Sequence, residues 1–83
     1  MKITLKLHAN LMDRLPPGTV GHAVVLDVDD TTCVGEVLDR YGLPPGVAKL
    51  VLVNGHYIAP EARASAPLAD GDHLAVWPPV AGG

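Results

Sequence analysis

The chain has 83 residues, of which 48% are hydrophobic and 18% are charged, and its formal net charge at pH 7 is −3. This length allows a single domain around one core. The small excess of Asp and Glu over Lys and Arg argues against nucleic acid as a partner, because binding to phosphates depends on cationic contacts, and it favours a protein partner with a basic groove. Apolar runs of only a few residues, and no signal-like start, predict a soluble cytoplasmic protein with no membrane partner.

The chain begins with two strand patterns. Residues 2–8 alternate strictly, with Ile3, Leu5 and Leu7 on one face, which predicts a strand with one buried face. Residues 15–18 (Leu-Pro-Pro-Gly) break the pattern as a turn, and a second strand is predicted from about residue 22 to residue 28. The two strands are expected to pair as a hairpin.

One amphipathic helix follows. Val34, Val37, Leu38 and Tyr41 fall at positions i, i+3, i+4 and i+7. Residues 29–32 (Asp-Asp-Thr-Thr) supply residues of the capping type, and the identity of the N-cap stays open. Residues 42–46 (Gly-Leu-Pro-Pro-Gly) are expected to end the helix, beginning with a left-handed glycine at position 42. Gly35, near the helix start, is interpreted as allowing close approach to the sheet.

The second half of the chain predicts three more strands. Residues 49–53 form a β-branched and leucine run, and the Asn-Gly pair at 54–55 is a strong hairpin signal before a short return strand at 56–58. Residues 59–66 are expected to be irregular, and residues 70–72 (Asp-Gly-Asp) to form a tight turn. In the last strand, residues 73–77, Leu74 and Val76 share one face while Ala75 and Trp77 share the other.

These elements predict an α+β fold with one helix on one face of a mixed sheet of four to five strands. Residues 1–77 are assigned to the globular domain and residues 78–83 to an extended C-terminal tail. Proline at positions 78 and 79 ends the last strand, because proline cannot donate a ladder hydrogen bond.

The tail finishes in Gly82-Gly83, behind Pro78, Pro79, Val80 and Ala81. Two glycines form a thin, permissive strip that can enter a channel too narrow for other residue pairs. A frayed terminus is the alternative. Since a diglycine falls on the last two positions by chance in roughly half a per cent of chains, we favour a functional tail.

At this point the residues carry a family likeness. The chain resembles the ubiquitin-like sulfur carriers, the group of the molybdopterin synthase small subunit and the thiamine sulfur carrier. The likeness spans nearly the whole chain and rests on these segments: 8–11 (His-Ala-Asn-Leu), 34–38 (Val-Gly-Glu-Val-Leu), 51–55 (Val-Leu-Val-Asn-Gly), Leu68 with 70–72, and the ending 78–83.

The resemblance implies a β-grasp fold whose last strand lies inside the sheet beside the first. It also implies that a ubiquitin-activating-type enzyme consumes ATP to adenylate the Gly83 carboxylate, and that sulfur from a donor protein converts it to a thiocarboxylate. Three positions depart from the family pattern: Trp77 replaces a smaller aromatic, Cys33 a capping threonine, and His8 an aromatic. These departures leave the partner's identity open.

The residues themselves predict a carrier that is not an enzyme. No phosphate loop and no Ser-His-Asp or Cys-His constellation with suitable spacing is present, so no catalytic residue and no bound cofactor is expected. Four histidines without ligand spacing predict no metal site. Six extended tail residues span at most about 20 Å, enough to place Gly83 inside another protein's active site. Trp77 is a candidate interface anchor or, equally, a half-buried sheet residue. The lone Cys33 is interpreted as a small buried or capping residue.

The leading hypothesis is a sulfur carrier for molybdenum or tungsten pterin cofactor synthesis. Gly83 is then the modified residue, residues 78–82 insert into the activating enzyme, and a synthase subunit accepts the sulfur, with this chain as its non-catalytic small subunit. The alternatives are a ubiquitin-like modifier joined to lysines through Gly83, a sulfur carrier for thiamine or another metabolite, and a non-covalent β-grasp interaction module.

Overall fold

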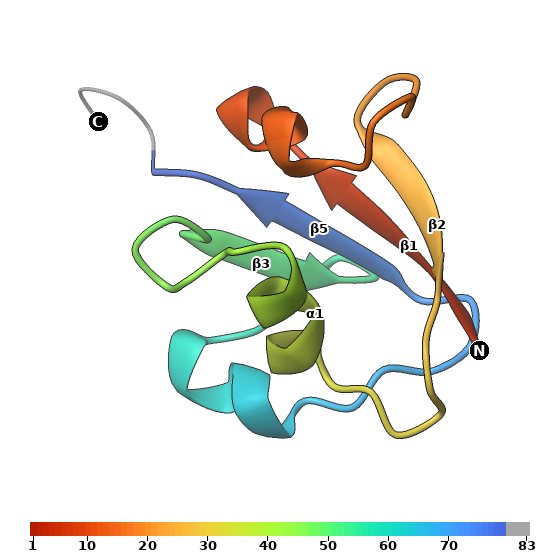
Figure 1. The fold of residues 1–83 in the computed structure, drawn as a ribbon. Coiled ribbons are helices and arrows are strands. Elements are labelled where there is room, and N and C mark those ends of the chain that lie inside the picture. The colour runs from red at the N-terminus through yellow and green to blue at the C-terminus, as the bar shows by residue number, and fades with distance from the viewer. Residues whose placement is uncertain (80–83) are drawn as a thin grey trace.

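The computed structural model describes residues 1–79, which form a five-stranded mixed sheet with one α-helix across one face (Figure 1). The elements in chain order are β1 (Lys2–Leu7), the 3-10 helix η1 (Ala9–Arg14), β2 (Ala23–Asp27), α1 (Val34–Arg40), β3 (Leu50–Val53), β4 (His56–Tyr57), the 3-10 helix η2 (Pro60–Ser65) and β5 (His73–Trp77). The predicted order of five strands and one helix is confirmed. Neither 3-10 helix was predicted, and the irregular segment expected at residues 59–66 is wrong where η2 forms.

The strand order in the sheet is β2-β1-β5-β3-β4. β5 lies in the interior, parallel to β1 and antiparallel to β3, with Leu7 opposite Val76 on one side and Val51 opposite Val76 on the other. The β-grasp expectation, with the last strand inside the sheet beside the first, is confirmed. The interior strand is therefore the one that leads into the C-terminal tail.

The core lies between the sheet and α1. Strand alternation turns one set of side chains toward the helix, and the i, i+3, i+4 spacing of α1 returns a matching stripe. The most deeply buried of these side chains are Ile3, Leu5, Leu7, Val34, Val37, Val51, Leu74 and Val76. The predicted faces of the first strand, the helix and the last strand are confirmed.

The structure identifies the N-cap of α1, which the sequence left open, and shows where the helix ends. Cys33 is the N-cap, and its backbone N–H donates to Glu36 Oε1 at 3.3 Å. The helix stops before Gly42, which takes the predicted left-handed conformation with φ of 66°. The expected close approach of Gly35 to the sheet is wrong: a Cβ built there would lie 3.2 Å from the Cα of Ala64, so the close approach is to η2.

Turn chemistry fixes the β3–β4 hairpin. Asn54 and Gly55 both have positive φ, 51° and 85°, as the Asn-Gly pair predicts. β4 is one residue shorter than expected, ending at Tyr57. The predicted tight turn at residues 70–72 is also present, with Gly71 at φ of 87°.

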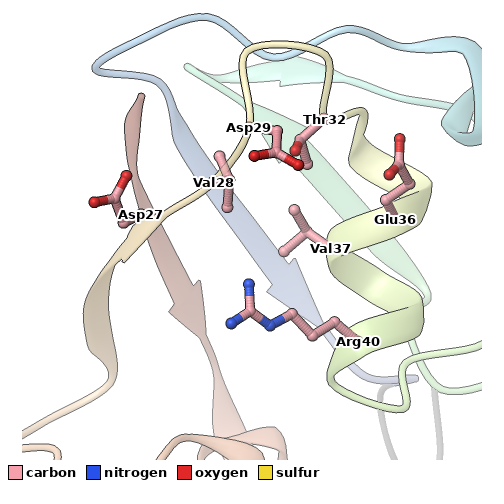
Figure 2. Close-up of a pocket in the computed structure, with 7 residues that line it drawn as sticks. All are labelled: Asp27, Val28, Asp29, Thr32, Glu36, Val37 and Arg40. Atoms are coloured by element: carbon pink, nitrogen blue, oxygen red, sulfur yellow. The ribbon is translucent and has the colours of Figure 1, made fainter.

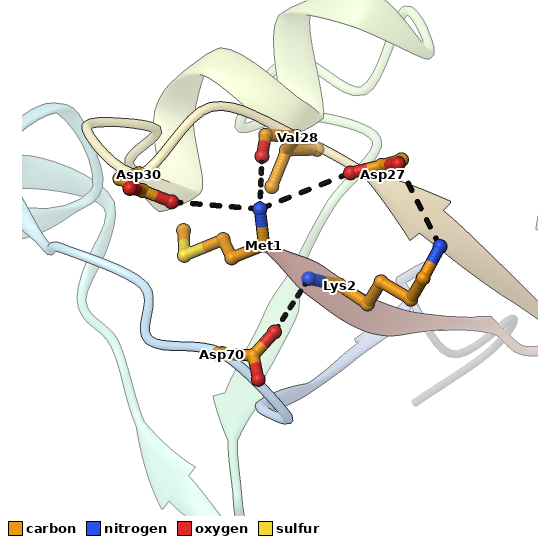
Figure 3. Close-up of polar contacts among 6 residues, drawn as sticks. All are labelled: Met1, Lys2, Asp27, Val28, Asp30 and Asp70. Atoms are coloured by element: carbon orange, nitrogen blue, oxygen red, sulfur yellow. Dashed lines mark hydrogen bonds and ion pairs between the residues drawn. The ribbon is translucent and has the colours of Figure 1, made fainter.

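Polar contacts tie the start of β1 to its surroundings (Figure 3). The Met1 amino group donates to the Val28 carbonyl at 2.8 Å, and the Lys2 N–H donates to Asp70 Oδ1 at 2.7 Å. Lys2 Nζ lies 3.6 Å from Asp27 Oδ2. Because β1 and β5 are parallel, these contacts occupy the end of the sheet opposite the end where the tail leaves. Within residues 1–79, no helix has both the length and the apolar character needed to cross a bilayer.

Candidate functional site

The tail leaves the sheet at the end of β5, between η1 and the loop before β3 (Figure 1). Two backbone hydrogen bonds hold this point: His8 N–H donates to the Val76 carbonyl at 3.0 Å, and Lys49 N–H donates to the Trp77 carbonyl at 2.9 Å. Both neighbouring strands thus fix β5 up to its last residue. The tail begins from a rigid position, not from a loop.

The tail predicted from the sequence is described here only at its base. Pro78 is half-buried and Pro79 is exposed, and the strand ends before them as predicted. Val80, Ala81, Gly82 and Gly83 lie outside the described residues. Insertion of this segment into an enzyme, and covalent modification at Gly83, therefore stay predictions.

Two open hollows flank the base of the tail. The larger, of about 500 Å³, lies on the face of the sheet that α1 does not cover and is lined by Ala9, Asn10, Lys49, Leu50, Trp77, Pro78 and Pro79. The smaller, of about 200 Å³, is lined by Asn10, Leu11, Arg14, Gly46, Val47, Pro78 and Pro79. Both hollows are lined by Asn10, Pro78 and Pro79, so the base of the tail adjoins each of them.

Trp77 sits beside the tail base with its ring packed on a histidine. The ring of Trp77 is stacked on the imidazole of His8, with centroids 4.1 Å apart and planes 2° from parallel. The His8 ring lies 5.1 Å from that of His22. The half-buried state expected for Trp77 is confirmed, and its role as an interface anchor stays a prediction.

The histidines at 8 and 22 are residues whose grouping the sequence did not predict. Leu7 pairs with Val76 in the parallel ladder, so the next residues along, His8 and Trp77, come side by side at the strand ends. The contact of His8 with Trp77 could have been predicted from the parallel pairing of β1 and β5, once the β-grasp topology is assumed.

The environment of His8 opposes its protonation. Burial lowers the pKa of its imidazole, and the neighbouring His22 and Lys6 lower it further. Burial acts by disfavouring the charged form, and the two neighbours act as like charges. The ring that stacks on Trp77 at neutral pH is therefore the neutral imidazole.

A third hollow, of about 540 Å³, continues from Trp77 along the uncovered face of the sheet. It is lined by Lys6, His8, His22, Leu52, Asn54, Gly55, His73, Ala75 and Trp77. We call this face, together with the larger hollow at the tail base, the open face. It carries aromatic and aliphatic side chains together with lysines and histidines.

The described residues around the tail base offer no cluster of metal-ligating side chains. Across residues 1–79 there is no group of three or more His, Cys, Asp or Glu side chains arranged to hold a metal ion. Cys33 caps α1, as one of its sequence interpretations expected, and lines none of the hollows around the tail.

Comparisons with known proteins place this geometry in a family. The sequence matches the model of the ThiS family over residues 17–83. No match was found among curated proteins. Among solved structures, SAMP1 from Haloferax volcanii is similar over all of both chains, with 31% identity and a TM-score of 0.69.

Two further structures extend the likeness. The Haloferax volcanii HVO 2177 protein is 27% identical, with all of this chain and 87% of that chain covered and a TM-score of 0.73. The second structure is the complex of subunits 1 and 2 of the molybdopterin-converting factor from Helicobacter pylori 26695. One of its chains is 23% identical to this chain, with all of both chains covered and a TM-score of 0.61. At 23% identity, the likeness to the Helicobacter pylori chain shows a shared fold and nothing more.

The family match spans residues 17–83, and the similarity to SAMP1 extends over the full length of both chains. The β-grasp sheet, with its interior last strand leading into the tail, is the fold that these relatives share. The chain belongs to the ThiS family of small ubiquitin-like proteins.

Proposed function

We propose that this chain is a cytoplasmic sulfur carrier that is activated at its C-terminus. The observation that supports it best is the departure of the tail from the interior strand β5, which is fixed on both sides up to Trp77. Six residues follow, ending in Gly82-Gly83. The tail therefore starts at a defined position beside the uncovered face of the sheet.

The chemistry proceeds on partner proteins. A free carboxylate is a poor acyl donor, so an oxygen of the Gly83 carboxylate first attacks the α-phosphorus of ATP and displaces pyrophosphate on an activating enzyme. The terminal sulfur of a persulfide on a donor protein then attacks the acyl carbon, and AMP leaves. A thiol cleaves the S–S bond of the resulting acyl disulfide, which releases the Gly83 thiocarboxylate and leaves that thiol and the donor joined in a disulfide. The carrier contributes the carboxylate, the thin approach of Gly82, and the stiff prolines, which reduce the entropy lost on insertion.

The acceptor that we favour is the sulfur-accepting subunit of a pterin cofactor synthase, with this chain as the non-catalytic small subunit. Support comes from the Pro-Pro-Val-Ala-Gly-Gly ending and from the shared fold of a molybdopterin-converting factor subunit that is found in a complex with its partner subunit. Sulfur delivery to thiamine or another metabolite uses the same terminal chemistry.

The test is adenylation followed by intact mass spectrometry. The full chain is incubated with ATP and the ubiquitin-activating-type enzyme of its native host, with and without a sulfur donor. We expect pyrophosphate release and then exchange of one oxygen for sulfur at Gly83. A chain lacking Gly83, and a chain with one alanine appended after Gly83, are both expected to be inactive. Equal pyrophosphate release from these two variants and the wild type contradicts the proposal.

Conjugation to proteins is the second candidate, and the full-length similarity to SAMP1, which is a small archaeal modifier protein, favours it. Here the activated Gly83 carbonyl is attacked by a lysine amine of a target. The two functions are distinguished by denaturing purification of the tagged chain from its native host. Isopeptide-linked adducts support conjugation, and a thiocarboxylate without adducts supports the carrier alone.

A further inference from the structure

One charged side chain on the helix side is buried without a matching charge. Arg63, on η2, is 4% exposed, and its Nη1 donates to the carbonyl of Ala48 at 2.8 Å. Its Nε and Nη2 have no hydrogen-bond partner among residues 1–79, and no carboxylate of those residues lies within 4 Å of the guanidinium. Native structures pair nearly all such buried groups, so these two donors indicate a partner that the described chain does not supply.

The two nitrogens without a partner form one edge of the guanidinium. Nε–H and one N–H of Nη2 point in parallel from that edge, which is the geometry that binds two oxygens of a single carboxylate or phosphate. Nη1, which donates to the Ala48 carbonyl, completes the other edge. The first edge of Arg63 is therefore a bidentate donor for an oxyanion.

Arg63 lines a hollow of about 160 Å³ that is enclosed by α1, η2 and the loop before β3. Pockets for drug-sized ligands have volumes of roughly 300–1,000 Å³. The hollow at Arg63 therefore suits a small ion better than a nucleotide or a peptide.

The other ionisable side chain that lines this hollow is that of Asp39, in the last turn of α1. Gly35 and Asp39 are four residues apart and share one face of the helix. A Cβ built on Gly35 would lie 3.2 Å from the Arg63 carbonyl oxygen, so this face packs on η2. A carboxylate at the end of a helix is disfavoured by the helix dipole, so the stability of α1 does not explain Asp39.

The second hollow on the helix side lacks this combination. It has a volume of about 290 Å³, lies between the end of β2 and α1, and is lined by Asp27, Asp29, Glu36 and Arg40 (Figure 2). Arg40 is exposed, so water hydrates its guanidinium, and three carboxylates line the same space. This hollow does not select an anion, and Arg40 provides a matched control for Arg63.

We propose that the hollow at Arg63 binds inorganic phosphate that carries a proton. Nε and Nη2 of Arg63 donate to two phosphate oxygens, and the P–OH group donates to the Asp39 carboxylate. Near neutral pH phosphate keeps at least one proton and sulfate keeps none, so Asp39 accepts a hydrogen bond from phosphate and repels sulfate. This site goes beyond the sulfur-carrier function and does not depend on it.

The entry of the ion involves η2. Nε and Nη2 of Arg63 have almost no area open to water, so the ion reaches them when η2 moves slightly outward. η2 is a 3-10 segment, in which hydrogen-bond geometry is poorer than in an α-helix. Its last hydrogen bond, from the Ala66 N–H to the Arg63 carbonyl, is 3.4 Å long. Segments held by few and weak hydrogen bonds open at low cost in free energy.

Calorimetric titration of the intact chain at pH 7 and constant ionic strength tests the site, with phosphate, sulfate and O-phosphoserine as separate probes. We expect saturable binding of phosphate, and binding of sulfate at least about tenfold weaker, because sulfate cannot donate to Asp39. The midpoint of thermal denaturation is expected to rise with phosphate and not with sulfate. Equal or tighter binding of O-phosphoserine, whose ester group needs more room, contradicts a site for the free ion.

Three variants assign the binding to its residues. Arg63→Lys keeps the charge and loses the parallel donors, so it is expected to abolish phosphate binding, while Arg40→Lys leaves the affinity within about twofold. Asp39→Asn changes an exposed side chain and leaves Arg63 in place, so the test also holds if circular dichroism shows that Arg63→Lys does not fold. Since the asparagine amide donates to either ion, sulfate is expected to bind Asp39→Asn at least as tightly as phosphate does.

Three results would overturn the proposal. The first is the absence of saturable phosphate binding by the wild type. The second is equal affinity for phosphate and sulfate in both the wild type and Asp39→Asn. The third is unchanged phosphate binding by a folded Arg63→Lys chain, which would place the ion elsewhere on the molecule.

Discussion

The two faces of the sheet are built from the same strands and differ in burial and composition. On β5, Leu74 and Val76 point to α1 and are fully buried, while His73, Ala75 and Trp77 point to the open face. One residue of offset along the strand separates the two sets, because successive side chains alternate between faces. One set of alternate positions of this strand therefore builds the core, and the other set lines the open face.

The side chains on the two faces of the sheet also differ in chemical type. The helix-facing set is purely aliphatic, and the acidic residues of the chain lie mostly in α1, the loops and the turn outside the strands. The open face combines aromatic, histidine and lysine side chains without a helix to cover them. A substitution on one face is thus expected to change the free energy of unfolding, and one on the other to change partner binding.

Leu74→Ala is expected to have the largest effect on stability. Leu74 is 0% exposed in the interior strand, so truncation leaves a cavity and costs about 2–5 kcal/mol in the free energy of unfolding. Urea denaturation followed by circular dichroism measures this. The control is His73→Ala, one residue earlier on the exposed face, with an expected change within about 0.5 kcal/mol. Comparable losses in the two variants would mean that the faces do not divide as described.

Trp77→Ala is expected to affect adenylation more than stability. Loss of the stack on His8 and of part of the side-chain burial costs about 1–2 kcal/mol in stability, which leaves the domain folded. The adenylation kcat/KM is expected to fall at least about tenfold, since a central tryptophan of an interface is a common hot spot. Trp77→Phe keeps an aromatic ring and is expected to recover most of the loss. An unchanged kcat/KM in Trp77→Ala would remove Trp77 from the docking surface.

The sequence was sufficient for the elements that have a strong local signal. Alternation identified β1 and β5, helical spacing identified α1, and the Asn54-Gly55 pair identified the β3–β4 hairpin. Each of these signals depends on neighbours within a few residues. The parallel placement of β5 beside β1 came from the family resemblance, because no local pattern determines a pairing between strands at opposite ends of the chain.

The elements and contacts that the sequence did not predict lack a local signal of this kind. η1 and η2 are 3-10 segments of six residues each, too short for a clear periodic pattern. The contact of Gly35 with η2 could not be predicted while η2 itself was expected to be irregular. The cluster of His8, His22 and Trp77 depends on strand register across the sheet, and the net charge gave no information about how the charges divide between its two faces.

The smallest effect that we expect concerns His8 in the free protein. Burial first, and then His22 and Lys6, lower the pKa of its imidazole below the value of 6.5 for an unperturbed histidine. The unfolded chain therefore binds a proton more readily than the folded one, and the contribution of His8 to stability falls as the pH drops below about 6.5. This loss stops growing once the pH is below the folded pKa.

Thermal denaturation of the wild type and His8→Gln between pH 5 and pH 8 tests this. The two are expected to diverge below about pH 6.5, with the wild type losing more stability, because glutamine cannot take up a proton. Acidification is thus expected to weaken the fold slightly, and parallel curves for the two proteins would show that His8 carries no linked proton.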